Sequence, residues 1–167
     1  MRRNLPALFL VLTVLGLGLA AGVRDRLDDW IAATVLPAFE VPVGVEVVAR
    51  DGSLLRAFQV ADGRWRLDPG PVDPLYLDML MLWEDRRFPD HSGVDFRALL
   101  RAGGQALRHG RVVSGGSTLT MQVARLIEEG PVGQWSGKGR QIRLALALER
   151  RLTKREILGL YLRLAPY

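Results

Sequence analysis

The chain has 167 residues, which suits one domain with an appendage, and its 49% hydrophobic content suffices for a core and a membrane segment. The absence of cysteine excludes a disulfide framework and thiolate metal sites. The net charge of +5 is unevenly distributed along the chain: residues 24–100 carry 9 Arg against 14 acidic residues, whereas residues 101–167 carry 12 Lys and Arg against 4 Glu. The second half therefore favours an anionic partner or forms a basic solvated face.

The first predicted element is an uncharged apolar run over residues 5–23. As a helix it reaches nearly 30 Å, at about 1.5 Å per residue, which is about one hydrocarbon core. Arg2 and Arg3 precede it and favour a cytoplasmic N-terminus with an exported remainder. A cleaved signal peptide is the alternative, but the length of the run favours an anchor. We therefore expect a transmembrane anchor over 1–23 and a juxtamembrane linker over 24–42.

Two Asp-Gly pairs, at 51–52 and 62–63, lie among β-branched residues in the next segment. Asp-Gly between such runs is a strong hairpin signal, and it indicates turns in which both central residues have positive φ. We predict a small antiparallel sheet, a β-hairpin region, over residues 43–73.

From residue 74 onward the apolar spacing becomes helical, and residues 74–167 are predicted to form a mostly α-helical domain. The first helix places Leu75, Met79, Leu82 and Trp83 on one face. Asp95 is the predicted N-cap of the next helix, and Thr153 with Glu156 fits a capping box before the last. The expected elements are a helix from 74 to about 88, a helix over 96–109, a glycine turn and capped helix within 114–129, a loop over 130–139, a basic helix over about 140–152 and a final helix.

Glu84 opens the stretch EDRRFPDHSG, at the end of an apolar helix and next to two arginines. Burial would disfavour its ionised form and nearby cations would favour it, and a carboxylate held between these influences can act as a general base on a hydroxyl. A helix-terminal acid in a surface ion pair is the alternative. Asp85 is expected to brace the backbone or an arginine, and His91 to be a structural hydrogen-bonding residue.

The stretch GGST (115–118) opens a helix, where free N–H groups and the helix dipole suit an anion, although an ordinary glycine-rich helix entry is equally compatible. Gln122 and Arg125 lie one turn apart and could face one ligand. Lys138, Arg140 and Arg143 suit a diphosphate leaving group, although isolated surface charges would look the same. The few aromatic residues are not interleaved with basic ones, which counts against single-stranded nucleic acid.

Taken in order, these stretches resemble the peptidoglycan glycosyltransferase domain, glycosyltransferase family 51, as found in the N-terminal part of class A penicillin-binding proteins of the 1C type. The resemblance covers about residues 45–167 and rests on EDRRFPDHSGVD, GGSTLTMQ and KREILGLYLRLAP, which are similar to the first, second and fourth family motifs. It implies a mostly α, lysozyme-like fold with a small N-terminal β-hairpin, preceded by one transmembrane helix. The family domain continues beyond residue 167, and a transpeptidase domain normally follows, so we expect a fragment that is incomplete at the C-terminus.

The resemblance implies that lipid II is polymerised into glycan strands by inverting glycosyl transfer, with Glu84 as the general base. The implied partners are lipid II, polyprenyl-diphosphate-linked glycan, other cell-wall synthesis proteins and the bacterial inner membrane. The catalytic part is expected on the outer face of that membrane, and nucleic acid is not an expected partner. The implied substrate- and diphosphate-binding residues are Ser117, Thr118, Gln122, Arg125, Lys138 and Gln141, and the implied supporting residues are Asp85, Phe88, His91, Gly93, Gly115 and Gly116.

The sequence departs from the family pattern at several positions. Gln141 stands where the third motif has a Glu, so no metal ligand is assigned, no cofactor is certain and a divalent cation, Mg²⁺ or Mn²⁺, is left open. Met121 replaces a common Gln, and Gly159 and Arg163 replace a usual Glu and Asn. Two alternatives stay open: a non-catalytic membrane stub, which an incomplete domain favours, and a lysozyme-like glycan hydrolase, which an essential Glu in a helical lobe would also suit.

Overall fold

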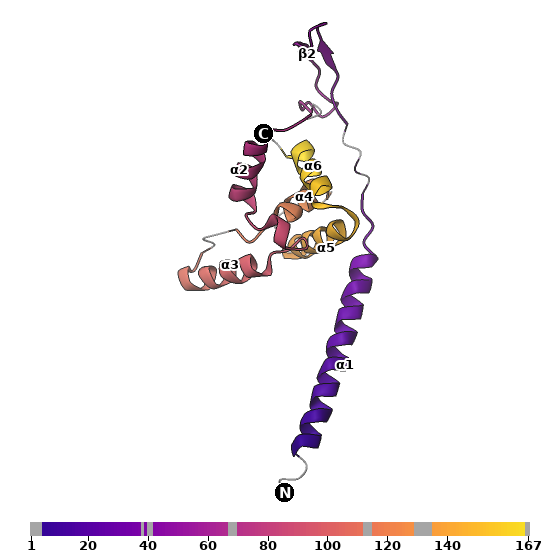
Figure 1. Cartoon of the computed structure of the whole chain (residues 1–167), viewed down its shortest axis with the longest axis vertical. Helices are drawn as coiled ribbons and strands as arrows, with labels where there is room; N and C mark the ends of the chain where they lie inside the picture. Colours follow the sequence, from indigo (N-terminus) through magenta and orange to yellow (C-terminus); the bar gives the residue numbers. More distant parts are fainter. Residues whose placement is uncertain are drawn as a thin grey trace. The chain divides into compact units, whose positions relative to one another are not determined.

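The computed structural model describes residues 5–37, 39, 42–66, 70–111, 115–128 and 135–165. The chain divides into two compact units, Met1–Val35 and Leu36–Tyr167, and each is described by itself. Helices dominate both, and one small two-stranded sheet precedes the helical part of the second unit (Figure 1). The predicted class, mostly α with a small N-terminal β-hairpin, is confirmed.

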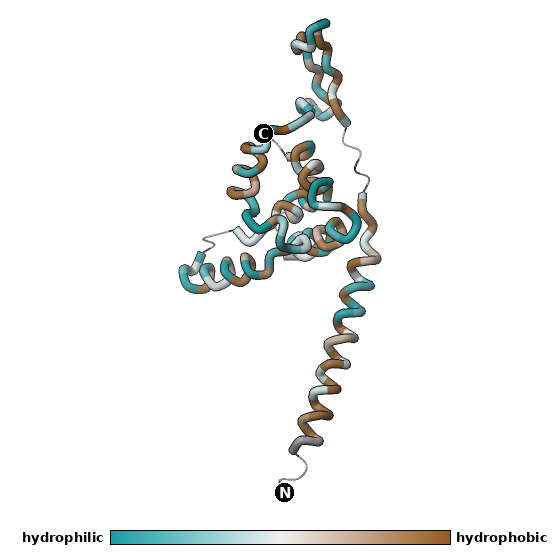
Figure 2. The backbone as a smooth tube through the Cα atoms, viewed as in Figure 1, coloured by the Kyte–Doolittle hydropathy of each residue, from teal (hydrophilic) through white to brown (hydrophobic). Residues whose placement is uncertain are grey.

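Helix α1 runs over Leu5–Ala32. By length and composition it could cross a membrane, a property that signal sequences share. It continues past the apolar run into the charged residues 24–29, where Figure 2 changes from brown to teal. Arg24 and Asp28 form an i,i+4 ion pair at 3.7 Å, which supports helix in that stretch. At about 1.5 Å per residue, a helix of 28 residues exceeds a hydrocarbon core of about 30 Å by roughly two turns.

The predicted hairpin forms from β1 (Glu46–Val48) and β2 (Leu54–Ala57), which pair antiparallel. The predicted turn geometry is wrong in one respect, because only Gly52 has positive φ, at 84°, while Asp51 does not. The Gly52 N–H donates to Ala49 O at 3.0 Å, and Ala49 N–H donates to Ser53 O at 2.8 Å. This is a type I turn followed by a left-handed glycine, which needs only one residue with positive φ.

The helical part of the second unit has its core where three helices meet (Figure 1). These are α4 (Leu119–Ile127), α5 (Trp135–Arg151) and α6 (Lys154–Leu164). Helices α2 (Pro74–Glu84) and α3 (Phe96–His109) and the short 3₁₀ helix η2 (Phe88–Asp90) precede them. The fully buried side chains of this core include Leu119, Met121, Val123, Leu148 and Ile157.

Helix starts follow the predicted caps. The Asp95 carboxylate accepts hydrogen bonds from the N–H groups of Arg97 and Ala98, so the predicted N-cap of α3 is confirmed. The capping box of Thr153 and Glu156 is likewise present in full. Each of these interactions spans three residues or fewer and is therefore encoded locally.

Two predicted boundaries are wrong. Helix α2 ends at Glu84, because Asp85 has non-helical dihedral angles (φ −159°, ψ 76°) and its carboxylate binds the first N–H of α4. Helix α5 begins at Trp135, although its first turns are rich in glycine. Packing of α5 against α4 outweighs the weak helix propensity of that stretch, and Lys138 consequently lies on a helix instead of in a loop.

The apolar stripe of α2 faces outward. Leu75, Met79 and Leu82 are exposed, and Trp83 is 88% exposed. Helix α2 has no fully buried residue and packs on the core through the partly buried Leu80 and Met81. Its position therefore depends on the segment that follows it.

Candidate active site

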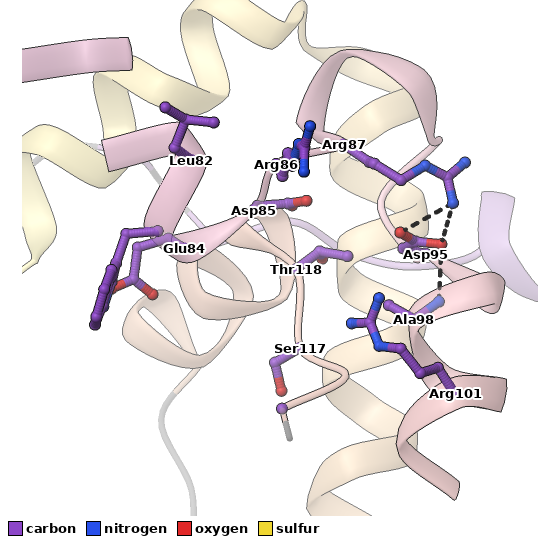
Figure 3. A pocket seen from close by; sticks show the side chains of 12 residues that line it. Leu82, Glu84, Asp85, Arg86, Arg87, Asp95, Ala98, Arg101, Ser117 and Thr118 are labelled. Atoms are coloured by element: carbon purple, nitrogen blue, oxygen red, sulfur yellow. Dashed lines mark hydrogen bonds and ion pairs between the residues drawn. The ribbon is translucent and has the colours of Figure 1, made fainter. Parts of the chain in front are cut away.

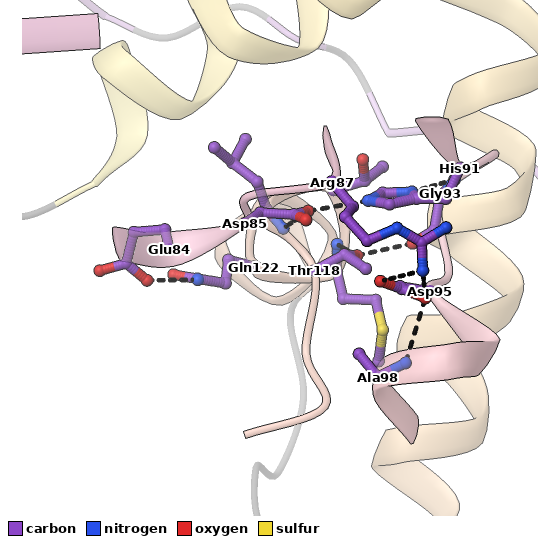
Figure 4. A network of polar contacts seen from close by, with 12 residues as sticks. Glu84, Asp85, Arg87, His91, Gly93, Asp95, Ala98, Thr118 and Gln122 are labelled. Carbon is purple, nitrogen blue, oxygen red and sulfur yellow. Dashed lines mark hydrogen bonds and ion pairs between the residues drawn. The ribbon is translucent and has the colours of Figure 1, made fainter. Parts of the chain in front are cut away.

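The carboxylate of Glu84 lies at the C-terminal end of α2, beside the first turns of α4. Its Oε2 accepts a hydrogen bond of 2.8 Å from Nε2 of Gln122 (Figure 4). Glu84 is half-buried, and within the described part of the chain Oε1 makes no hydrogen bond. The end of α2 and the first turns of α4, the helix that GGST opens, thus meet at this carboxylate.

Asp85 is buried and engaged by two donors. Its Oδ2 accepts from Leu119 N–H at 2.8 Å and lies 2.9 Å from Nε2 of His91 (Figure 4). The Nδ1 atom of His91 accepts from Gly93 N–H at 3.2 Å, so the neutral ring carries its proton on Nε2 and donates it to Asp85. Asp85 was expected to brace the backbone or an arginine. In the structure its carboxylate binds the backbone N–H of Leu119 and the ring of His91.

Gly93 lies at the closest approach of this segment to the core. It has φ of +91°, and a Cβ built there would lie 2.7 Å from the carbonyl oxygen of Ala145 on α5. Its own carbonyl accepts the Thr118 hydroxyl at 2.6 Å. That hydroxyl also caps α4 by accepting from Met121 N–H, and Thr118 is buried, so it acts as a structural link between the two motifs.

The two glycines before α4 differ in their surroundings. A Cβ at Gly116 would lie 2.8 Å from Cδ2 of Leu99, so this glycine allows the backbone to approach α3. Gly115 has no neighbouring atom within 4 Å of such a Cβ and lines the larger pocket described next. The close approach expected from the GGST stretch is therefore made to a helix at Gly116.

A pocket of about 430 Å³ opens between the end of α2, α3 and residues 115–118 (Figure 3). Glu84 lines it together with Arg86, Arg87 and Arg101. Arg87 pairs with Asp95 at 3.1 Å. Burial acts to raise the pKa of Asp95, but the hydrogen bond from Ala98, the Arg87 charge and the hydrogen bond from Arg97 outweigh it and lower the pKa. Arg101 was missed in the sequence, because it lies on a helix without a recognised motif.

A second pocket of about 180 Å³ lies on the other side of Ser117, which lines both. Nζ of Lys138 donates to the Ser117 hydroxyl at 2.6 Å. Burial lowers the pKa of Lys138, and the neighbouring Arg125 charge lowers it further. Two positive charges in one cavity favour an anionic ligand. The lining residues are Ser117, Met121, Gln122, Arg125, Lys138 and Gln141.

Other predicted residues lie elsewhere or have structural surroundings. Arg140, grouped with Lys138 in the sequence, pairs with Glu128 at 2.5 Å instead of facing the pocket. Phe88 is buried in the core. Tyr161, which was not among the predicted site residues, lies on α6. Burial raises its pKa, with the Glu84 charge as the next cause.

The donor set does not fit a directly bound metal. Among the residues that the structure describes, no group of three His, Asp or Glu side chains could hold one. Gln141 brings an amide to the smaller pocket in place of a carboxylate. Amide oxygens bind divalent cations, but hard cations in proteins are usually held by carboxylates.

The sequence of this chain is similar to those of known proteins. The family model described as Transglycosylase matches residues 51–167. Penicillin-binding protein 1C of Escherichia coli (strain K12) is 51% identical over 134 residues, which are 79% of this chain and 17% of the relative. Penicillin-binding protein 1A of Pseudomonas aeruginosa is 38% identical over 125 residues, 73% of this chain and 15% of that relative. A biosynthetic peptidoglycan transglycosylase of Yersinia pseudotuberculosis serotype O:1b (strain IP 31758) is 31% identical over 150 residues, 87% of this chain and 62% of that relative. The chain thus spans less than two thirds of the length of each relative.

Proposed function

Because the chain belongs to the transglycosylase family, glycosyltransferase family 51, we propose that it polymerises lipid II into glycan strands by inverting transfer. The names of the relatives, which include a biosynthetic peptidoglycan transglycosylase, support this substrate class. The observation that carries the proposal is the half-buried carboxylate of Glu84, which is oriented by Gln122 and lines a pocket that shares Ser117 with a cationic cavity.

Glu84 is the one carboxylate available to act as a base in the larger pocket, as far as the described residues go. Three carboxylates line this pocket, but Asp85 accepts from Leu119 and His91, and Asp95 caps α3 and pairs with Arg87. In our mechanism Oε1 of Glu84 takes the proton of the acceptor sugar hydroxyl as the hydroxyl oxygen bonds to the donor anomeric carbon. Since the described residues of this pocket offer no second carboxylate as a nucleophile, the displacement is single and the anomeric configuration inverts.

The leaving group is a lipid diphosphate, whose oxygen takes the electron pair of the broken glycosidic bond. Lys138 and Arg125 line the smaller pocket and would stabilise the charge that develops on that oxygen. Ser117 and Gln122 line the same pocket and would contact the substrate there. Entry of a dianionic group would also relieve the repulsion between the two cations.

Membrane attachment fits substrates that carry lipid chains. We place α1 across the bacterial inner membrane, with the second unit on its outer face, because Arg2 and Arg3 precede the apolar run. The domains of this arrangement are the anchor over 1–23, the linker over 24–42, the hairpin region over 43–73 and the glycosyltransferase part over 74–167.

Polymerisation of labelled lipid II by the purified chain in detergent micelles tests the proposal. The parent should form glycan strands on a gel, and Glu84→Gln should reduce the rate by at least about 100-fold, which is within the range of general base catalysis. Asp78→Asn is a matched control on the exposed face of the same helix and should leave the rate unchanged.

Three outcomes would contradict the proposal. Full activity of Glu84→Gln would exclude this carboxylate as the base. Release of short sugars from finished cell wall, with none made into strands from lipid II, would indicate a hydrolase. Absence of any turnover by the parent would indicate a non-catalytic membrane protein.

A further inference from the structure

The helix that carries Glu84 is fixed mainly through the segment after it. Helix α2 has no buried residue, whereas Asp85, Phe88 and Gly93 in residues 85–93 are all buried. Asp85 binds the first N–H of α4, and Gly93 binds the hydroxyl of Thr118. Whatever holds this segment against the core therefore also sets the position of the Glu84 carboxylate.

Lys154, the first residue of α6, contacts this segment in two ways. Its Nζ donates to the carbonyl oxygen of His91 at 2.5 Å. The same ammonium lies 4.5 Å from the centroid of the Phe88 ring, which is a cation–π distance. The Lys154 side chain thus contacts both the buried Phe88 ring and the backbone of His91, whose side chain binds Asp85.

The position of Lys154 is itself fixed by a buried acid. Nζ donates to Oε1 of Glu149 on α5 at 2.7 Å, and the Glu149 side chain is 7% exposed. The same oxygen accepts the hydroxyl of Thr120 at 2.6 Å. Thr120 follows Leu119, whose N–H binds Asp85, so the contacts form a closed ring. The ring runs through Asp85, His91, Lys154, Glu149, Thr120 and Leu119.

We infer that Lys154 is a positioning residue for the base: it clamps residues 88–91 so that Asp85 stays on Leu119 and Glu84 stays on Gln122. The inference rests on the proposed function, because it assigns Lys154 a role in that reaction. Lys154 touches neither pocket, so its effect reaches Glu84 only through the segment that it holds. Figure 4 shows the contact of Asp85 with His91 that belongs to this ring, with Glu84 bound to Gln122 beside it.

The side-chain amide of Gln122 reports the position of Glu84 without any turnover. In the full chain, labelled with ¹⁵N-glutamine and held in detergent micelles, the Gln122 side-chain amide resonance should shift in Lys154→Met, because its hydrogen bond to Glu84 is lengthened or lost. Lys154→Arg keeps the charge and should leave the resonance near its parent position. Arg155→Met, at the exposed neighbouring residue, is the matched control and should not shift it.

Steady-state kinetics with lipid II then separates positioning from binding. Lys154→Met should lower kcat by about 10- to 100-fold, since small displacements of a catalytic group have effects of this size. KM for lipid II should stay within about twofold, because the Lys138 and Arg125 pocket is untouched. A loss of stability alone would lower the active fraction but would not shift the Gln122 resonance of the folded protein.

Lys154→Met leaves Glu149 without its cation and could unfold the chain. The double variant Glu149→Gln/Lys154→Met removes both charges and still lacks the clamp, so its folded form should show the same Gln122 shift. An unshifted resonance in the folded variants overturns the inference, and so does a shifted resonance with unchanged kcat. If the parent has no turnover, the proposed function fails and the Gln122 resonance alone decides whether the clamp exists.

Discussion

Substituting Gly93 by alanine should destabilise the second unit strongly. The backbone there has φ of +91°, which costs a residue with a Cβ roughly 1–2 kcal/mol. The new Cβ would also lie 2.7 Å from the Ala145 carbonyl oxygen and 2.9 Å from its carbon, both part of a rigid helix backbone. Relieving such an overlap costs roughly 1–3 kcal/mol. The expected loss is therefore about 2–5 kcal/mol in the free energy of unfolding, a large share of a total of about 5–15 kcal/mol.

Urea unfolding in detergent micelles, followed by far-ultraviolet circular dichroism, measures this loss. Gly103→Ala is the matched control, because Gly103 lies within α3 and a Cβ there meets no atom within 4 Å. It should be neutral or stabilising by up to about 1 kcal/mol, since alanine is the better helix former. If Gly93→Ala unfolds within about 0.5 kcal/mol of the parent, the close approach of residues 85–93 to α5 is wrong, and with it the argument that this segment positions Glu84.

Three further predictions concern the charged groups around the site. Asp85→Ala leaves Leu119 N–H and His91 Nε2–H without their acceptor, and each buried donor should lower the free energy of unfolding in urea by roughly 1–3 kcal/mol. A total loss below about 1 kcal/mol would contradict the bracing role. Because the pKa of Lys138 is lowered, binding of inorganic diphosphate measured by calorimetry should weaken with rising pH at a lower pH than for an ordinary lysine, whose pKa is 10.5. Lys138→Arg should abolish that weakening, and an identical pH dependence in both proteins would exclude Lys138 from the anion site. The pKa of Asp95 is lowered on folding, so its contribution to stability is complete above about 3.8 and is lost as the pH falls through the lower folded value. Asp95→Asn keeps the cap but loses the Arg87 pair, and it should flatten the acid limb of the stability curve and cost roughly 1 kcal/mol at pH 7.

The sequence by itself determined the elements whose signals are local. The Asp95 cap, the Thr153–Glu156 capping box and the hairpin near Gly52 each depend on residues within about four positions of one another, and the structure contains all three. The stretches that carry Glu84 and Ser117 were also recognisable, because each motif is contiguous. The apolar run at residues 5–23 predicted a helix for the same reason, although the helix continues to Ala32, past the i,i+4 ion pair of Arg24 and Asp28.

Only the tertiary structure decided which of these helices and motifs contact one another. Gln122 meets Glu84 across 38 positions of sequence, Leu119 meets Asp85 across 34, and Lys154 meets His91 across 63. Arg101 reaches the larger pocket, and Arg140 turns to Glu128, for reasons that no local pattern contains. A local motif can set the conformation of a turn or a helix end, but the partners of a buried polar group are set by how α4, α5 and α6 pack, and that packing sums weak contacts over the whole chain.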